Sequence, residues 1–119
     1  MVRGEEKRAA FDGALMQCGD DEVREMLENR KRYPINPDMD ALLTTHAAVS
    51  VFMDASSFEE MIVTAVNMGG DADTVGAVCG ALGGAYWGLE SIPKDLVAGL
   101  LERERIEKAA FTLAKAATE

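Results

Sequence analysis

Two carboxylates and a hydroxyl stand close together in the middle of the chain. Asp71 and Asp73 are separated by one alanine and Thr74 follows directly, so three hard oxygen donors lie within one turn of backbone. Such donors suit Mg²⁺, Mn²⁺ or Ca²⁺, whereas zinc sites favour His and Cys. The preceding Gly69 and Gly70 can adopt positive φ and allow substrate or water to approach the backbone closely. The pattern favours a divalent-cation site, with the two glycines as substrate-binding positions.

The same residues have two simpler interpretations. Asp73 or Thr74 could be the N-cap of the following helix, because both side chains accept hydrogen bonds from first-turn N–H groups. A glycine turn before a helix N-terminus also attracts phosphate. Two aspartates would repel a phosphate unless a cation stood between them, and a cap uses only one of the three oxygens. A metal site explains the whole cluster, and capping stays an open alternative.

The sequence around these residues resembles a known family. It reads NMGGDADT over residues 67–74 and VGAVCGALGGAYWG over residues 75–88. This stretch is similar to the C-terminal signature of the ADP-ribosylglycohydrolase family, which includes dinitrogenase-reductase-activating glycohydrolases and J1 crystallins. The sequence SFEE at residues 57–60 and the pair Ile92-Pro93 fit the same pattern. The resemblance therefore runs from about Asp40 to about Leu101.

Membership of this family implies an all-α fold and a two-metal centre of Mg²⁺ or Mn²⁺. It also implies hydrolysis of the bond between ADP-ribose and a protein side chain or related acceptor. The implied partners are an ADP-ribosylated protein or a small molecule that contains ADP-ribose. Asp71, Asp73 and Thr74 match one set of the family's metal ligands position by position. No catalytic residue is assigned, because the family's catalytic acid lies in an N-terminal half that this chain does not match.

The family's N-terminal half also carries a Thr-Asp-Asp ligand triplet. The nearest match here, residues 19–22 (GDDE), lacks the threonine and is predicted to cap a helix. We therefore interpret residues 1–119 as a single all-α domain, the C-terminal portion of a longer hydrolase that supplies half of a two-metal site. A separate N-terminal segment or another copy of the chain would complete the site. The alternative is a catalytically inactive helical module of the same family, with a structural or interaction role.

Composition narrows the class of partner. The chain has 119 residues, of which 48% are hydrophobic, as expected for one globular domain. Its net charge of −9 argues against nucleic acid and against an anionic membrane as direct partners. Cys18 and Cys79 lie in apolar helical contexts and are predicted to be free thiols. The N-terminal residues lack the apolar core of a signal peptide, so we expect a cytoplasmic location.

Hydrophobic periodicity predicts a bundle of about six or seven helices. The helices are expected near residues 5–18, 20–32, 39–53, 58–66, 74–88, 93–101 and 106–117. Residues 33–38 contain two prolines and are predicted to form a loop between peripheral helices (residues 1–38) and a family-like core (residues 39–119). Ser56 and Glu59 are expected to form a capping box.

Four glycines and one histidine lie within these predicted helices. Gly76, Gly80, Gly84 and Gly88 fall four residues apart, although each glycine inside a helix costs about 0.8–1 kcal/mol relative to Ala. We expect neighbouring helices to pack closely against this face, with a bound ligand as the second possibility. His46, the only histidine, is expected to be a hydrogen-bonded core residue.

The last two predicted helices are amphipathic. Each is expected to bury an apolar side against the bundle. The residues concerned are Leu96, Val97, Leu100 and Leu101 in the first helix, and Ile106, Ala109, Ala110, Leu113 and Ala117 in the second.

Overall fold

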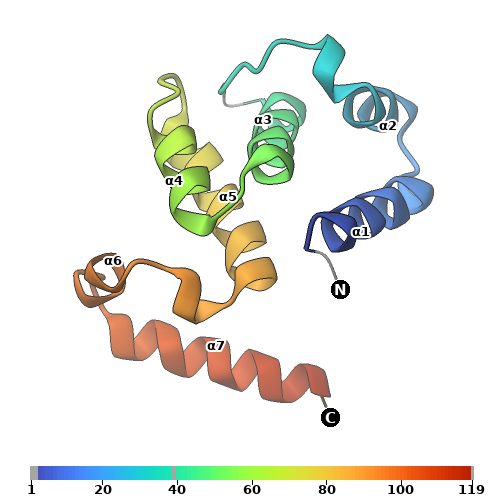
Figure 1. Ribbon diagram of the computed structural model, residues 1–119. Helices are drawn as coiled ribbons and strands as arrows, with labels where there is room; N and C mark the ends of the chain where they lie inside the picture. The colour runs from blue at the N-terminus through green and yellow to red at the C-terminus, as the bar shows by residue number, and fades with distance from the viewer. Residues whose placement is uncertain (1–2, 39, 119) are drawn as a thin grey trace.

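The computed structural model describes residues 3–38 and 40–118, and this part of the chain is all-α (Figure 1). Its seven α-helices are α1 (Arg3–Gln17), α2 (Asp21–Glu28), α3 (Ala41–Asp54), α4 (Phe58–Val66), α5 (Ala72–Trp87), α6 (Lys94–Ala98) and α7 (Arg103–Thr118). Two 3₁₀ turns, η1 (Arg30–Arg32) and η2 (Leu89–Ser91), join them. The predicted fold class is confirmed. None of the described helices combines the length and apolar character that a bilayer span requires.

Helices α3, α4 and α5 pack together to form the core. Their fully or nearly fully buried apolar side chains are Ala47, Ala48, Val51, Phe58, Met61, Ala65, Val75 and Cys79. Gly83 of α5 faces Met61 of α4, and an added Cβ at Gly83 would lie 2.5 Å from Cε of Met61. A side chain at position 83 would therefore force the fully buried Met61 side chain to move.

The expected close packing along the other α5 glycines is wrong. An added Cβ at Gly80 or Gly84 would meet no described atom within 4 Å, and at Gly76 the nearest atom lies at an ordinary 3.6 Å. Gly88 has φ of 88° and ends the helix. The glycine that packing requires is Gly83, because it shares the buried face of Val75 and Cys79 at intervals of four residues.

Side-chain caps start three of the helices close to the expected positions. Asp20 accepts hydrogen bonds from the first-turn N–H groups of α2, and Asp40 does the same for α3. The predicted capping box is one residue too early. Ser57 Oγ accepts from the Glu60 N–H at 3.1 Å, and the Glu60 carboxylate accepts from the Ser56 N–H at 3.3 Å. Ser57 has the extended backbone that an N-cap requires, so α4 begins at residue 58.

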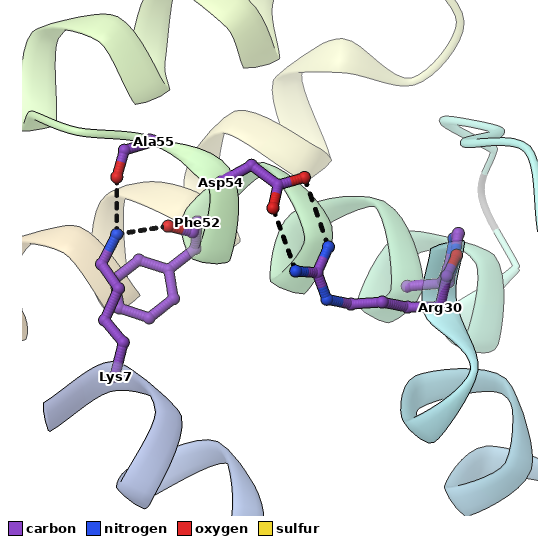
Figure 2. Close-up of polar contacts among 6 residues, drawn as sticks. Lys7, Arg30, Phe52, Asp54 and Ala55 are labelled. Atoms are coloured by element: carbon purple, nitrogen blue, oxygen red, sulfur yellow. Dashed lines mark hydrogen bonds and ion pairs between the residues drawn. The ribbon is translucent and has the colours of Figure 1, made fainter. Parts of the chain in front are cut away.

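Helix α1 is attached to the core through a buried lysine (Figure 2). Lys7 Nζ donates to the carbonyl oxygens of Phe52 (2.6 Å) and Ala55 (2.7 Å), at the C-terminal end of α3. It also lies 4.6 Å from the ring centroid of Phe52 and 4.4 Å from that of Trp87. A cation is favoured both at a helix C-terminus and over aromatic faces. Burial lowers the pKa of Lys7, and the charges of two nearby carboxylates oppose that shift.

The η1 turn is fixed to α3 by two kinds of contact from Arg30. Its guanidinium makes two hydrogen bonds to the Asp54 carboxylate, at 3.0 and 3.3 Å (Figure 2). These bonds lower the pKa of Asp54. The Arg30 carbonyl lies 2.8 Å from Nε2 of His46, which is fully buried. The prediction for His46 is confirmed, and the carbonyl acceptor places the ring proton on Nε2.

The two C-terminal helices are where burial was predicted wrongly. The described residues of α7 include no buried side chain, and Leu96, Leu100, Leu101, Ile106 and Leu113 are exposed. Figure 1 shows α7 running apart from the α3–α5 bundle. Helix α7 also begins earlier than expected, at Arg103, directly after Glu102 with φ of 55°. The amphipathic pattern is present, but this chain does not cover its apolar side.

We predict that Lys7→Met lowers the free energy of unfolding by about 1–3 kcal/mol, because it leaves two carbonyl groups without their buried donor. The matched control is Arg8→Met, which removes a neighbouring charge whose exposed ion pair with Asp12 contributes roughly 0–1 kcal/mol. Urea denaturation followed by circular dichroism measures both. Equal losses in the two variants would contradict the role assigned to Lys7.

The two cysteines are free, as predicted, and should differ in reactivity. Burial raises the pKa of Cys79 to about 11, and its thiol is fully buried, whereas Cys18 is partly exposed. Because the thiolate is the reactive form, iodoacetamide should modify Cys18 in the folded chain and reach Cys79 only after unfolding. Mass spectrometry of the two peptides measures this. Modification of Cys79 at the rate of Cys18 would show that the core opens.

Candidate metal centre

The acidic turn, defined as residues 69–74, leads directly into α5. Asp71 occupies the N-cap position, with φ of −86° and ψ of 55°, and its side chain makes no capping hydrogen bond. Asp73 and Thr74 lie in the first turn of the helix. Neither Asp73 nor Thr74 is therefore the N-cap of α5, as the capping alternative required. Asp71 is the N-cap residue, and its carboxylate does not cap the helix.

The carboxyl groups of Asp71 and Asp73 lie close to each other in the acidic turn. Asp73 Oδ1 accepts a hydrogen bond from the Thr74 N–H at 3.0 Å. The neighbouring Asp71 side chain and, after it, the Thr74 N–H lower the pKa of Asp73. Two ionised carboxylates this close repel each other. A cation placed between their oxygens would remove that repulsion.

The donor set fits part of a hard-cation site. Asp71 is partly exposed and Asp73 and Thr74 are exposed, so an ion and its water can reach all three. Within residues 3–38 and 40–118, no group of three or more His, Cys, Asp or Glu side chains is placed to bind one metal ion. Two carboxylates and one hydroxyl would provide about half of the six oxygens that Mg²⁺ requires.

The two glycines of the turn differ in their surroundings. Gly69 has φ of 76°, and an added Cβ there would meet no described atom within 4 Å. Gly70 has φ of 57°, and its added Cβ would lie 2.3 Å from the carbonyl oxygen of Pro37. That same oxygen accepts a hydrogen bond from the Asp71 N–H at 2.7 Å. Gly70 therefore has a structural reason to be glycine, and substrate binding by either glycine stays a prediction.

Sequence reasoning missed the contact between residues 33–38 and the acidic turn. The segment was recognised as a loop because Pro34 and Pro37 exclude helix there. Prolines also stiffen a chain, which is the one signal that this loop has a fixed position. Nothing in the sequence identified which backbone atoms it would contact.

The family model and the known proteins that match this chain agree on one family. The family model described as ADP-ribosylglycohydrolase matches residues 1–119, beyond the 40–101 stretch that carried the resemblance. The ADP-ribosylarginine hydrolase Tri1 of Serratia proteamaculans is 31% identical over 119 residues, which cover 95% of this chain and 32% of that protein. No solved structure is a significant match.

Two shorter matches agree with the first. The ADP-ribosyl-[dinitrogen reductase] glycohydrolase of Rhodospirillum rubrum is 36% identical over 64 residues, covering 51% of this chain and 22% of that protein. The ADP-ribosylhydrolase ARH3 of Bos taurus is 38% identical over 40 residues, covering 34% and 11% respectively. The matched stretches thus span about a third, or less, of the length of each of these relatives.

We predict that Gly70→Ala destabilises the chain more than Gly69→Ala. Both variants place a Cβ at positive φ, which costs about 1–2 kcal/mol. Only the Gly70 variant also forces the Pro37 carbonyl away from the turn. Urea denaturation gives the two free energies of unfolding. Equal values would mean that residues 33–38 move without resistance.

Proposed function

This chain belongs to the ADP-ribosylglycohydrolase family, and we propose that it is the C-terminal portion of a metal-dependent ADP-ribosyl hydrolase. In this proposal Asp71, Asp73 and Thr74 supply half of a two-metal site. The observation that carries it is the Asp71 side chain, which stands at the N-cap position of α5, makes no capping hydrogen bond and lies close to the Asp73 carboxyl group. Two carboxyl groups brought together at an exposed turn favour a divalent cation.

The three ligands have distinct roles. Asp71 and Asp73 would be anionic ligands of Mg²⁺ or Mn²⁺, and the Thr74 hydroxyl a neutral one. When bound, a metal pair supplies polarisation of the bond to be broken, hydroxide near neutral pH and a clamp on the substrate. Water, substrate, a separate N-terminal segment or another copy of the chain would provide the remaining oxygens.

The proposed substrate is an ADP-ribosylated protein or a small molecule that contains ADP-ribose. The relatives are named for different acceptors, namely arginine and dinitrogen reductase, and share the ADP-ribosyl group. ADP-ribose carries a diphosphate, which a chain of net charge −9 repels. A cation on the acidic turn would remove that repulsion at the point where the open space beside Gly69 lets substrate approach.

An inactive interaction module of the same family is the second candidate. Exposed apolar side chains of α6, α7 and the turn between them, such as Leu96, Leu101 and Phe111, favour it, because apolar surface of this kind often marks an interaction site. It differs from the hydrolase proposal in one property, since a module that has lost the chemistry has no need to bind a divalent cation at Asp73.

We predict that the chain binds Mn²⁺ in calorimetric titration and that Asp73→Ala weakens this binding. Mutation of a residue that only supports a metal ligand typically lowers metal affinity by roughly 10–100-fold, and loss of the ligand itself should cost at least as much. The matched control is Asp21→Ala, which removes the same charge from the first turn of α2 and should leave binding unchanged. Absence of binding, or equal loss in both variants, would contradict a specific site and favour the inactive module.

A further inference from the structure

Residues 33–38 lie across the backbone of the acidic turn. The Pro37 carbonyl accepts the Asp71 N–H at 2.7 Å, and the missing Cβ of Gly70 allows this approach. The bond is made at the residue that also carries the first carboxylate. The position of Pro37 therefore sets the main chain from which the Asp71 side chain departs.

Helix α3 fixes both ends of this segment. At its C-terminal end, the hydroxyl of Thr44 donates to the Asp38 carbonyl at 2.6 Å. At its N-terminal end, the Tyr33 ring packs edge-on against the His46 ring, with centroids 6.1 Å apart. Thr44 and His46 are both buried. The core thus reaches the acidic turn through two side chains of α3 and the intervening segment.

The Thr44 contact is the closer of the two to the turn. It is made to the carbonyl of the residue that follows Pro37, so loss of the hydroxyl frees the peptide next to the one that contacts Asp71. The Thr44–Asp38 hydrogen bond is partly buried and Asp38 itself is exposed. Without the Thr44 hydroxyl the Asp38 carbonyl can turn toward water, and the segment is no longer held to α3 at this point. Metal ligands tolerate displacements of only about 0.5 Å. A shift of residues 33–38 would therefore displace the metal ligands of the acidic turn.

We propose that Thr44 is a positioning residue for the metal half-site. It acts through the Asp38 and Pro37 carbonyls on the Asp71 main chain and touches neither the metal nor the substrate. The inference rests on the proposed function, because it assumes that the acidic turn binds a divalent cation.

The test compares three variants of the 119-residue chain. Thr44→Val removes the hydroxyl at nearly constant volume, and Thr44→Ser keeps it. Thr45→Val is the matched control, because Thr45 donates only within its own helix, to the Ala41 carbonyl at 2.7 Å. Two properties are measured: hydrogen exchange of the Asp71 amide without metal, and the Mn²⁺ dissociation constant by electron paramagnetic resonance.

Thr44→Val should accelerate exchange at Asp71 and weaken Mn²⁺ binding by about 10-fold or more, as loss of outer-shell partners does in metal sites. Thr44→Ser and Thr45→Val should resemble the wild type in both measurements. If Thr44→Val does not fold, Pro37→Gly takes its place, since it loosens the segment at a partly exposed loop position. It should have the same two effects.

The outcomes separate this inference from the proposed function. Unchanged Mn²⁺ affinity in Thr44→Val, with normal binding by the wild type, overturns the positioning role, whether or not Asp71 exchange changes. A wild-type chain that binds no Mn²⁺, or binds it equally well after Asp73→Ala, overturns the proposed function and this inference with it.

Discussion

The acidic turn depends on a backbone contact between two segments far apart in the sequence. The Pro37 carbonyl lies against Gly70 and accepts the Asp71 N–H, so the start of α5 is set from outside its own helix. If a side-chain cap alone fixed this helix N-terminus, the aspartate at the N-cap position would accept hydrogen bonds from the N–H groups of the first turn. Here the Asp71 N–H donates to a carbonyl of the loop, and the Asp71 carboxylate makes no capping hydrogen bond.

Helix α3 connects the core to this contact and to the peripheral helices. Thr44 and His46 fix the segment that reaches the acidic turn, while the C-terminal end of the same helix binds Lys7 and Arg30. Most of these attachments are polar and buried or half-buried, unlike the apolar packing between α4 and α5. Polar contacts fix direction as well as distance, which is what a site built from several segments requires.

The sequence predicted the helices, the loop at residues 33–38, the buried His46 and the family, because periodicity, prolines and a specific motif are local signals. Prediction from the sequence failed for burial and packing, because these depend on contacts with residues that are distant in the sequence. Lys7 looks like a solvated residue in a charged helix, and its aromatic and carbonyl neighbours are more than forty positions away. The α5 glycines predicted close packing, but only Gly83 faces Met61. The amphipathic character of α6 and α7 was predicted correctly, but an amphipathic pattern does not show which polypeptide packs against its apolar side.

The central claim is that a divalent cation binds between Asp71 and Asp73 on a turn fixed by residues 33–38. Paramagnetic broadening of the amide resonances by substoichiometric Mn²⁺ locates the ion directly, because the effect falls steeply with distance. The account predicts that the resonances of residues 70–75, together with that of Asp38 in the contacting segment, broaden first. Broadening spread evenly over the acidic surface, or centred on another group of carboxylates, would contradict it.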